Sequence, residues 1–445
     1  MRFLLGILAS MLLLMAAMTG CGPEGAVPTD NPPVSQELNI AVFEGGYGSG
    51  FWEALIAKFE EDNPGVKINM QISPEIGDVI RPQIAAGNVP DLLALAINDQ
   101  TGVVLSLIKD NCLLDITDVF DSPQYDSGAA LRGKITAGFL ESANCAPYGD
   151  GKIYLAPQNA GPMGLVYNKT LFEDNQWDIP MTWDDFFALG DRAKEQGIAL
   201  FTYPGIYPEY MESILWPAIA SAVGPEDFAK LQSYDVGIWG DPRVLALLGQ
   251  FAKIGSGGYL LAGTAALDHA MSQTEHMHNK ALFIPNGIWM ETEMRDAARA
   301  EGYAFALAPP PVMKEGDTRY VMSSFEQLSI PKAARNPELA RLFLRYFYTD
   351  EVLKMYADMC NAVIPTVNAT SLIEGLVSDG VYSMFGAYDE PGADPLIVGF
   401  DAPPDGALIR WSDEVFYSLS GLMNGSLSVQ ECSARIAAAA AQLSA

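Results

Sequence analysis

The chain has 445 residues and a mass of 48.0 kDa, which suffices for two large lobes or up to three domains. Hydrophobic residues make up 49% and charged residues 18%, a globular composition that excludes a disordered chain. Lys and Arg number 26 against 55 Asp and Glu, so the net charge is −29. This charge argues against nucleic acid as a partner and against docking to anionic lipid by charge alone.

The N-terminus has the pattern of a secretory signal. Arg2 gives a short basic start, residues 3–18 are almost entirely apolar, and small residues lead to Cys21. This pattern predicts a signal peptide over residues 1–20. The segment resembles a bacterial lipoprotein lipobox, although Met18 stands where Leu is usual, and the resemblance implies cleavage before Cys21 and its diacylation. The alternative is an ordinary membrane anchor with an incidental cysteine.

Residues 21–37 are expected to form a lipidated tether. The stretch 22–37 reads GPEGAVPTDNPPVSQE, and its prolines and glycines cannot build a core. Extended at roughly 3.3 Å per residue, it spans about 50 Å. We therefore expect an acidic globule anchored to the cell membrane on its extracytoplasmic face.

Four cysteines remain once Cys21 is set aside, namely Cys112, Cys145, Cys360 and Cys432. An exported protein can keep disulfides, and Cys112–Cys145 is the favoured pair because these two are the closest in sequence. Four free thiols are the alternative. The chain has no CxxC motif, so zinc-ribbon and thioredoxin-type sites are not supported.

Strand and helix patterns alternate along the chain, which predicts an α/β fold. The expected opening elements, in chain order, are a strand over 38–43, a glycine loop over 45–50, a helix over 51–62, a strand over 66–72, a helix over 80–86 and a buried strand over 90–96. Because helical crossovers join these strands, they should be parallel.

Two later stretches look like chain crossings between lobes. The first contains strands over 153–157 and 164–168, and a helix over 183–196 follows it. The second spans 303–331, with strands over 303–308 and 328–330. A helix over 336–356 and an Ala-rich helix over 429–443 complete the prediction.

Several catalytic chemistries lack support. The chain has neither a G-x-S-x-G elbow nor a phosphate-binding P-loop, although its glycine loop could present backbone N–H groups at a helix start. His269, His276 and His278 are the only histidines, and a solvated helix explains them better than a metal site. Glu291 and Glu293 could imitate a glycosidase carboxylate pair, but residues two apart on a helix do not share a face.

Aromatic residues make up 10% of the chain, and several lie beside amides, acids and glycines. Examples are Tyr47, Tyr210, Trp289 and Trp411. A pyranose has an apolar C–H face that stacks on an aromatic ring and a rim of hydroxyls that needs paired donors and acceptors. As a set, these residues favour a carbohydrate ligand.

Several stretches follow one another in a specific order along the chain, namely Phe59–Val66, Pro90-Asp91-Leu92, Leu155-Ala156-Pro157 with Val166–Lys169, Ala281–Trp289 and Asn336–Ala340. Together they resemble the family 1 extracellular solute-binding proteins, the maltodextrin-binding-like receptors of ABC importers, and the resemblance covers residues 38–445. Residues 262–294 look similar to the N-acetylglucosamine/diacetylchitobiose-binding branch.

The resemblance implies a two-lobed periplasmic-binding-protein-like fold of type II, with discontinuous lobes joined by hinge crossings. The N-terminal lobe would comprise 38–157 and 326–364, and the C-terminal lobe 158–325 and 365–445. Carried over residue by residue, it implies ligand contacts from Glu44, Tyr47, Asn98, Asp99, Gln158, Asn159, Trp289, Ser324 and Glu326, with Tyr210 and Trp411 as further candidates.

The sequence therefore predicts a monomeric, lipid-anchored receptor that captures a sugar and hands it to the permease subunits of an ABC importer. No catalysis, metal or other cofactor is expected. Two alternatives stay open: a surface glycoside hydrolase that uses a carboxylate pair, and a receptor for a non-sugar solute such as a polyamine or peptide.

Overall fold

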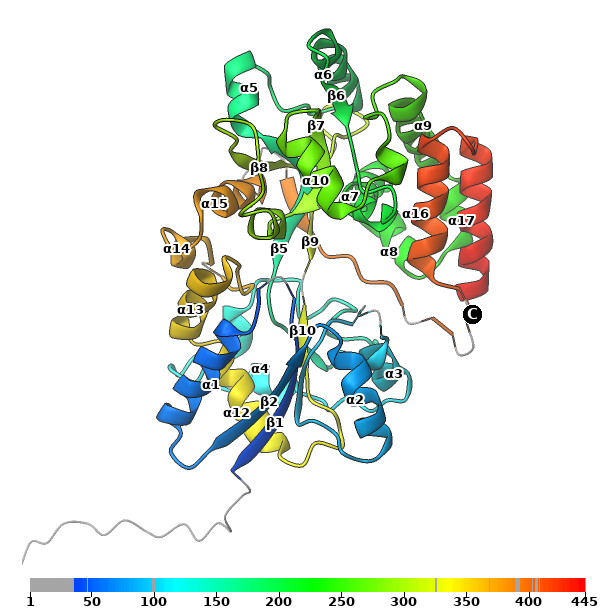
Figure 1. Ribbon diagram of the computed structural model, residues 1–445. Helices are drawn as coiled ribbons and strands as arrows, with labels where there is room; N and C mark the ends of the chain where they lie inside the picture. Colours follow the sequence, from blue (N-terminus) through cyan, green and yellow to red (C-terminus); the bar gives the residue numbers. More distant parts are fainter. Residues whose placement is uncertain are drawn as a thin grey trace, which may run out of the picture. The chain divides into compact units, whose positions relative to one another are not determined.

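Two β-sheets flanked by helices account for most of the chain from residue 36 onward (Figure 1). The computed structural model describes residues 36–45, 47–97, 99, 101–324, 326–367, 369–388, 393–401, 403, 404, 407 and 409–444. The predicted signal peptide, Cys21, the tether up to residue 35 and Asn98 lie outside the described residues. Within the described residues, no helix is both long and apolar enough to cross a bilayer.

The first sheet has the strand order β2-β1-β3-β10-β4. Its strands are β1 (Glu37–Phe43), β2 (Lys67–Ser73), β3 (Leu92–Ala94), β10 (Gln327–Ser329) and β4 (Leu155–Pro157). As predicted, β1 pairs in parallel with β2 and with β3. β10 pairs antiparallel with both β3 and β4, so a strand from late in the chain completes a sheet begun at the N-terminus.

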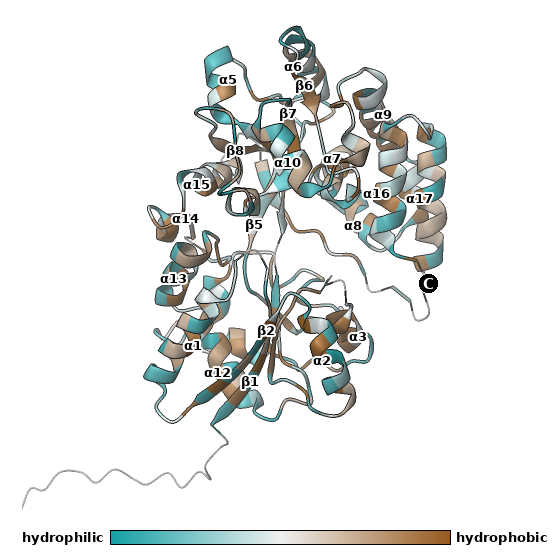
Figure 2. Ribbon diagram, in the orientation of Figure 1, coloured by the Kyte–Doolittle hydropathy of each residue, from teal (hydrophilic) through white to brown (hydrophobic). Residues whose placement is uncertain are grey.

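Alternation along β1 gives this sheet two buried faces. Leu38, Ile40 and Val42 pack with α1 (Gly50–Asp62) and α12 (Pro337–Phe347), whereas Ala41 packs with α2 (Ile76–Ala85) and α3 (Val103–Lys109). Figure 1 shows these helix pairs on opposite sides of β1 and β2. Figure 2 shows the strands as a hydrophobic layer between helices with mixed faces, as the period of two predicts.

The second sheet has the order β11-β9-β5-β7-β6, with β8 also paired to β5. Its strands are β5 (Gly161–Asn168), β6 (Ala199–Phe201), β7 (Ala281–Gly287), β8 (Phe305–Ala308), β9 (Arg319–Ser324) and β11 (Ala393–Leu396). Every residue of β7 is buried. The mixed α/β class and the two-lobed fold are confirmed, while the exact lobe boundaries stay a prediction.

The remaining helices pack mainly around the second sheet, and a few cover the first. They are α4 (Thr117–Asp121), α5 (Lys169–Asn175), α6 (Trp183–Glu195), α7 (Glu212–Val223), α8 (Pro225–Gln232), α9 (Pro242–Ser256), α10 (His269–Met277), α11 (Trp289–Glu293), α13 (Asp350–Cys360), α14 (Ala369–Ile373), α15 (Asp379–Phe385), α16 (Trp411–Met423) and α17 (Val429–Leu443). Short 3₁₀ turns are η1 (Leu131–Lys134), η2 (Pro208–Met211), η3 (Val236–Gly240), η4 (Thr264–Ala266) and η5 (Gly386–Tyr388).

Local sequence signals set several helix ends. α17 spans the predicted residues because Ser428 and Glu431 form a capping box, with the Glu431 N–H donating to Ser428 Oγ at 3.2 Å. The single helix expected over 336–356 is wrong. The chain breaks between α12 and α13, where the Val352 N–H donates to Thr349 Oγ1 at 3.4 Å and starts a new helix.

The favoured disulfide is also wrong. Cys112, Cys145, Cys360 and Cys432 are all free thiols, and all but Cys112 are buried. Sequence proximity had suggested the first pair, but Cys145 is fully enclosed in the core of the first lobe, whereas Cys112 lies at the edge of a separate cluster.

Candidate functional site

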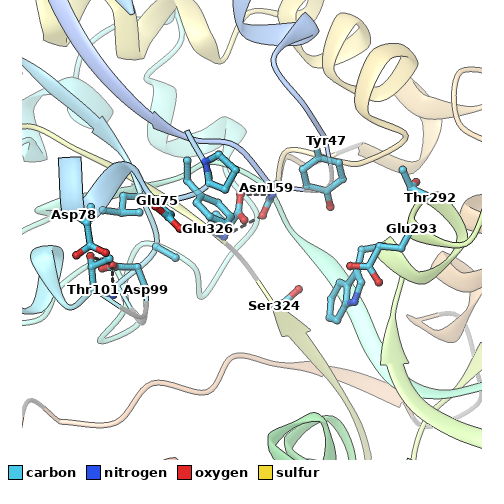
Figure 3. Close-up of a pocket in the computed structure, with 17 residues that line it drawn as sticks. Tyr47, Glu75, Asp78, Asp99, Thr101, Asn159, Thr292, Glu293, Ser324 and Glu326 are labelled. Atoms are coloured by element: carbon cyan, nitrogen blue, oxygen red, sulfur yellow. Dashed lines mark hydrogen bonds between the residues drawn. The ribbon is translucent and has the colours of Figure 1, made fainter. Parts of the chain in front are cut away.

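A cavity of about 880 Å³ lies between residues of the two sheets (Figure 3). On the first sheet its walls come from the segments that directly follow β1, β2 and β3. Ligands of α/β proteins bind at the carboxyl ends of parallel strands, so the fold directs these loops to one site. The described residues that line it are Phe43, Gly45, Tyr47, Pro74, Glu75, Gly77, Asp78, Leu95, Ala96, Asp99, Thr101, Asn159, Trp289, Thr292, Glu293, Ser324 and Glu326.

The structure brings most of the sequence-predicted residues together here. Those that line the cavity are Tyr47, Asp99, Asn159, Trp289, Ser324 and Glu326. Gln158 lines a small neighbouring cavity together with Tyr47 and Glu326. That any of them contacts a ligand stays a prediction.

Three predicted residues do not line the cavity. The Glu44 backbone N–H donates to Ser73 O at 3.1 Å. Tyr210 does not line the cavity, although its phenol hydrogen-bonds the lining residue Trp289. Trp411 is in a separate aromatic cluster, with its ring centroid 5.4 Å from Tyr234 and 5.7 Å from Phe400. Sequence context could not distinguish Trp411 from a binding residue, because an aromatic beside polar residues occurs at both kinds of site.

Glu326 connects two of the chain segments that run between the sheets, the β4–β5 segment and the β9–β10 segment. Its carboxylate Oε2 accepts hydrogen bonds from Gln158 Nε2 at 3.2 Å and Asn159 Nδ2 at 3.0 Å. Its backbone N–H donates to Asn159 Oδ1 at 3.0 Å, and its carbonyl accepts the Gln158 N–H at 2.8 Å. Burial raises the pKa of Glu326, and the Asn159 hydrogen bond opposes that rise.

Tyr47 and Tyr356 extend this network into the first lobe. Asn159 Nδ2 donates to the Tyr356 hydroxyl at 3.1 Å, and the Tyr356 ring contacts Tyr47 edge-on at 6.1 Å between centroids. Burial, reinforced by the Glu326 carboxylate, raises the pKa of Tyr47. The Tyr47 phenol therefore stays protonated and can donate a hydrogen bond.

The wall from the second sheet is built on β7 and α11. Trp289 begins α11 directly beyond the buried strand, and Glu293 ends it. Gln273 Nε2 donates to Glu293 Oε2 at 3.2 Å, whereas burial raises the pKa of Glu293. The Glu291 carboxylate turns away and hydrogen-bonds Ser378. Glu291 and Glu293 therefore do not form a carboxylate pair across one site.

His276 corrects the expectation of a solvated histidine segment. It is 1% exposed, and its Nδ1 contacts the Ala281 carbonyl at 3.0 Å. Burial lowers the pKa of His276 to about 4, so the ring is neutral and structural. Among the described residues, no group of three or more His, Cys, Asp or Glu side chains could hold a metal ion.

The cavity lining is acidic, and its carboxylates are spread from one end of the cavity to the other. Figure 3 shows Glu75, Asp78 and Asp99 gathered toward one end of the cavity, Glu293 toward the other end, and Glu326 between them. No Lys, Arg or His is among the described lining residues. These carboxylates can accept hydrogen bonds from a hydroxylated ligand or attract a cation.

Sequence reasoning missed Phe43, Glu75, Asp78 and Thr292, and it considered Glu293 only as part of a catalytic pair. All of them line the cavity. Phe43, Glu75 and Asp78 follow or end predicted parallel strands. Their position at strand carboxyl ends is the signal that could have found them.

A family model for bacterial extracellular solute-binding proteins matches residues 45–354. The chain belongs to this family. The family resemblance predicted from the sequence is thereby confirmed. Membership in an extracellular family also confirms the predicted location outside the cytoplasm.

Relatives of this solute-binding protein include the diacetylchitobiose binding protein NgcE of Streptomyces coelicolor, 25% identical over 370 residues that cover 81% of this chain and 75% of NgcE. A multiple sugar-binding protein of Streptococcus mutans is 23% identical, covering 68% of this chain and 69% of the relative.

Solved structures share the fold. The apo form of RafE from Streptococcus pneumoniae covers 94% of this chain and 100% of its own at a TM-score of 0.71 and 18% identity. A chitin oligosaccharide binding protein covers 92% of this chain and 98% of its own at a TM-score of 0.68 and 18% identity.

Proposed function

We propose that this solute-binding protein captures a carbohydrate in the cavity between its lobes and delivers it to the permease of an ABC importer. The single observation that carries the proposal is the lining itself, in which the Trp289 ring stands among carboxylates, an amide and hydroxyls drawn from both sheets. A pyranose needs this combination of flat apolar surface and paired polar groups. An N-acetylglucosamine or chitobiose-like sugar is the proposed class, supported by the similarity to a diacetylchitobiose binding protein and to a chitin oligosaccharide binding protein.

Binding without chemistry would proceed by closure of the lobes over the sugar. Glu326, Gln158 and Asn159 lie where the chain passes between the sheets, so contacts at the cavity act directly on the hinge. Closure is favoured because the ligand touches both walls only when they approach each other. Tyr47, Asn98 and Asp99 are proposed contacts from the first lobe, and Glu44 is not, because it does not line the cavity. The lobes would divide at the boundaries predicted from the sequence.

Calorimetry against a panel of mono- and oligosaccharides tests this function. N-acetylglucosamine or diacetylchitobiose should bind, and Trp289→Ala should weaken binding by about tenfold or more. Tyr417→Ala is the matched control, because Tyr417 is 56% exposed and does not line the cavity. Absence of binding across the panel would refute the proposal. Release of monosaccharide from chitobiose during incubation would instead support a hydrolase.

A cationic solute such as a polyamine is the second candidate. Five carboxylates line the cavity, and none of the described lining residues is Lys, Arg or His. Spermidine titrations at low and high salt separate the two functions. Attraction to the carboxylates weakens as salt rises, whereas stacking of a neutral sugar changes little.

The lipid anchor at Cys21 is proposed from the sequence motif. Cys21→Ser should release the protein from the membrane fraction into the medium or periplasm, and metabolic labelling with a fatty acid should be lost. Light scattering of the released protein tests the proposed monomer.

A further inference from the structure

Phe43 presents an exposed aromatic ring to the cavity. It is the last residue of β1 and is 40% exposed, whereas Ala41 and Val42 directly before it are 1% and 0% exposed. The same ring lines the small neighbouring cavity beside Gln158 and Glu326, so it stands next to the hinge network. An exposed phenylalanine on the wall of a cavity is apolar surface that folding leaves without a partner.

The Phe43 ring packs directly against the backbone of Gly45. A Cβ on Gly45 would lie 2.9 Å from Phe43 Cε1, which is closer than real Cβ contacts allow. The Phe43 ring therefore packs against the Gly45 backbone, while 40% of the residue stays exposed. Gly45 has no positive φ, so its backbone conformation does not require glycine. Glycine is required there because the Phe43 ring takes the space that a Cβ would occupy.

The opposite wall repeats this arrangement. A Cβ on Gly287 would lie 2.2 Å from Trp289 Cζ3, so the indole also rests on a glycine two residues away. Gly287 likewise has no positive φ. Phe43 belongs to the first sheet and Trp289 follows a strand of the second, and both line one cavity. Each lobe thus contributes one cavity-lining aromatic ring that packs against a glycine two residues away.

We infer that Phe43 and Trp289 take opposite faces of a single pyranose ring when the lobes close, an inference that rests on the proposed sugar-binding function. A pyranose with equatorial hydroxyls has axial C–H bonds on both faces, so each face can stack on an aromatic ring. The hydroxyl rim then points sideways toward the polar lining residues, which include Asn159, Ser324, Glu293 and Glu326. Phosphorylated sugars and sugar acids are excluded, because their negative charge would meet the lining carboxylates.

Proton NMR of a titrated sugar tests the clamp, with N-acetylglucosamine and diacetylchitobiose as probes. Aromatic ring currents move nearby protons upfield, and axial protons of a pyranose alternate between its faces. In the wild type, both sets of axial protons of one sugar residue should shift upfield. Phe43→Leu keeps an apolar side chain but removes the ring, so it should abolish the shift of one set only and weaken binding by about threefold to tenfold. Trp289→Leu should abolish the shift of the other set.

Gly45→Ala provides a second variant. It keeps phenylalanine at position 43, but the added Cβ displaces the Phe43 ring. It should reproduce the loss of the same set of shifts as Phe43→Leu. Tyr417→Leu, outside the cavity, should change neither shifts nor affinity.

Upfield shifts confined to one face in the wild type, or affinity within about twofold and unchanged shifts in Phe43→Leu, would overturn the clamp while leaving the sugar function intact. Absence of binding by every sugar in the wild type would refute the function itself, and the clamp with it.

Discussion

Asn159 and Glu326 exchange hydrogen bonds in both directions, with Asn159 Nδ2 donating to Glu326 Oε2 at 3.0 Å and the Glu326 N–H donating to Asn159 Oδ1 at 3.0 Å. The two residues are 167 positions apart and lie on two of the chain segments that link the sheets, one between β4 and β5 and the other between β9 and β10. Both also line the cavity. A ligand that contacts either side chain therefore acts on the connection between the lobes.

Glu326→Gln should weaken ligand binding while making stability less sensitive to pH. The neutral amide is a weaker acceptor than a carboxylate, so affinity should fall by about tenfold or more. Burial raises the pKa of Glu326, so the carboxyl contributes its stability at low pH and loses it as pH rises through the folded-state pKa. Calorimetry and denaturant titrations on the same variant check both effects. A variant with wild-type affinity would exclude a ligand contact by Glu326.

Glu212 predicts a second pH dependence outside the cavity. Burial raises the pKa of Glu212 to about 7, and the neighbouring Glu209 carboxylate adds to the rise. Because the folded-state pKa lies above the unfolded one, the contribution of Glu212 is complete below the unfolded pKa and lost as pH rises through about 7. The wild-type free energy of unfolding should therefore fall more steeply between about pH 5 and pH 8 than that of Glu212→Gln. Glu301→Gln, at an exposed position, is the control and should follow the wild type.

Gly255 and Gly249 form a matched pair on α9. A Cβ on Gly255 would lie 1.6 Å from the Met423 carbonyl oxygen at the end of α16, whereas a Cβ on Gly249 meets nothing within 4 Å. Gly255→Ala should therefore lower the free energy of unfolding by about 1–3 kcal/mol or more. Gly249→Ala should raise it by about 0.5–1 kcal/mol, because alanine favours the helix. Thermal or urea unfolding measures both, and equal effects at the two positions would contradict the close packing of α9 on α16.

The free thiols predict a specific labelling pattern. Burial raises the pKa of Cys360 and of Cys432 to about 12, and it raises the pKa of Cys145 as well. Of the four cysteines that the structure describes, only Cys112 is partly accessible. An aromatic disulfide reagent should therefore label Cys112 in the folded protein and all four thiols after denaturation without a reductant. A peptide map that links Cys112 to Cys145 would instead restore the disulfide inferred from the sequence.

Local patterns predicted most of the described strands but fewer than half of the described helices. Leu38, Ile40 and Val42 alternate as a strand with a buried face must, and Ser428 with Glu431 marks the start of the last helix. The missed break at Thr349 is also a local signal, but it lies inside a continuous apolar periodicity that hides it. The sequence therefore predicts secondary structure best where residues a few positions apart decide whether a strand or a helix forms.

The site required more than local pattern. Six of the eleven predicted contacts line the cavity, because they end or follow strands whose carboxyl ends the fold brings together. They are Tyr47, Asp99, Asn159, Trp289, Ser324 and Glu326. Trp411 has the same kind of sequence surroundings but packs against Tyr234 and Phe400, whereas Phe43 reads as a core strand residue and faces the cavity.

The amino-acid sequence alone determined the α/β class, the family, the parallel opening strands and the aromatic and amide residues from which a sugar site could be built. Only the tertiary structure decided which rings face the cavity, that Asn159 meets Glu326, and that the cysteines remain apart. The reason is physical: periodicity and capping depend on residues a few positions apart, whereas a cavity depends on the packing of segments separated by hundreds of residues, which no local pattern encodes.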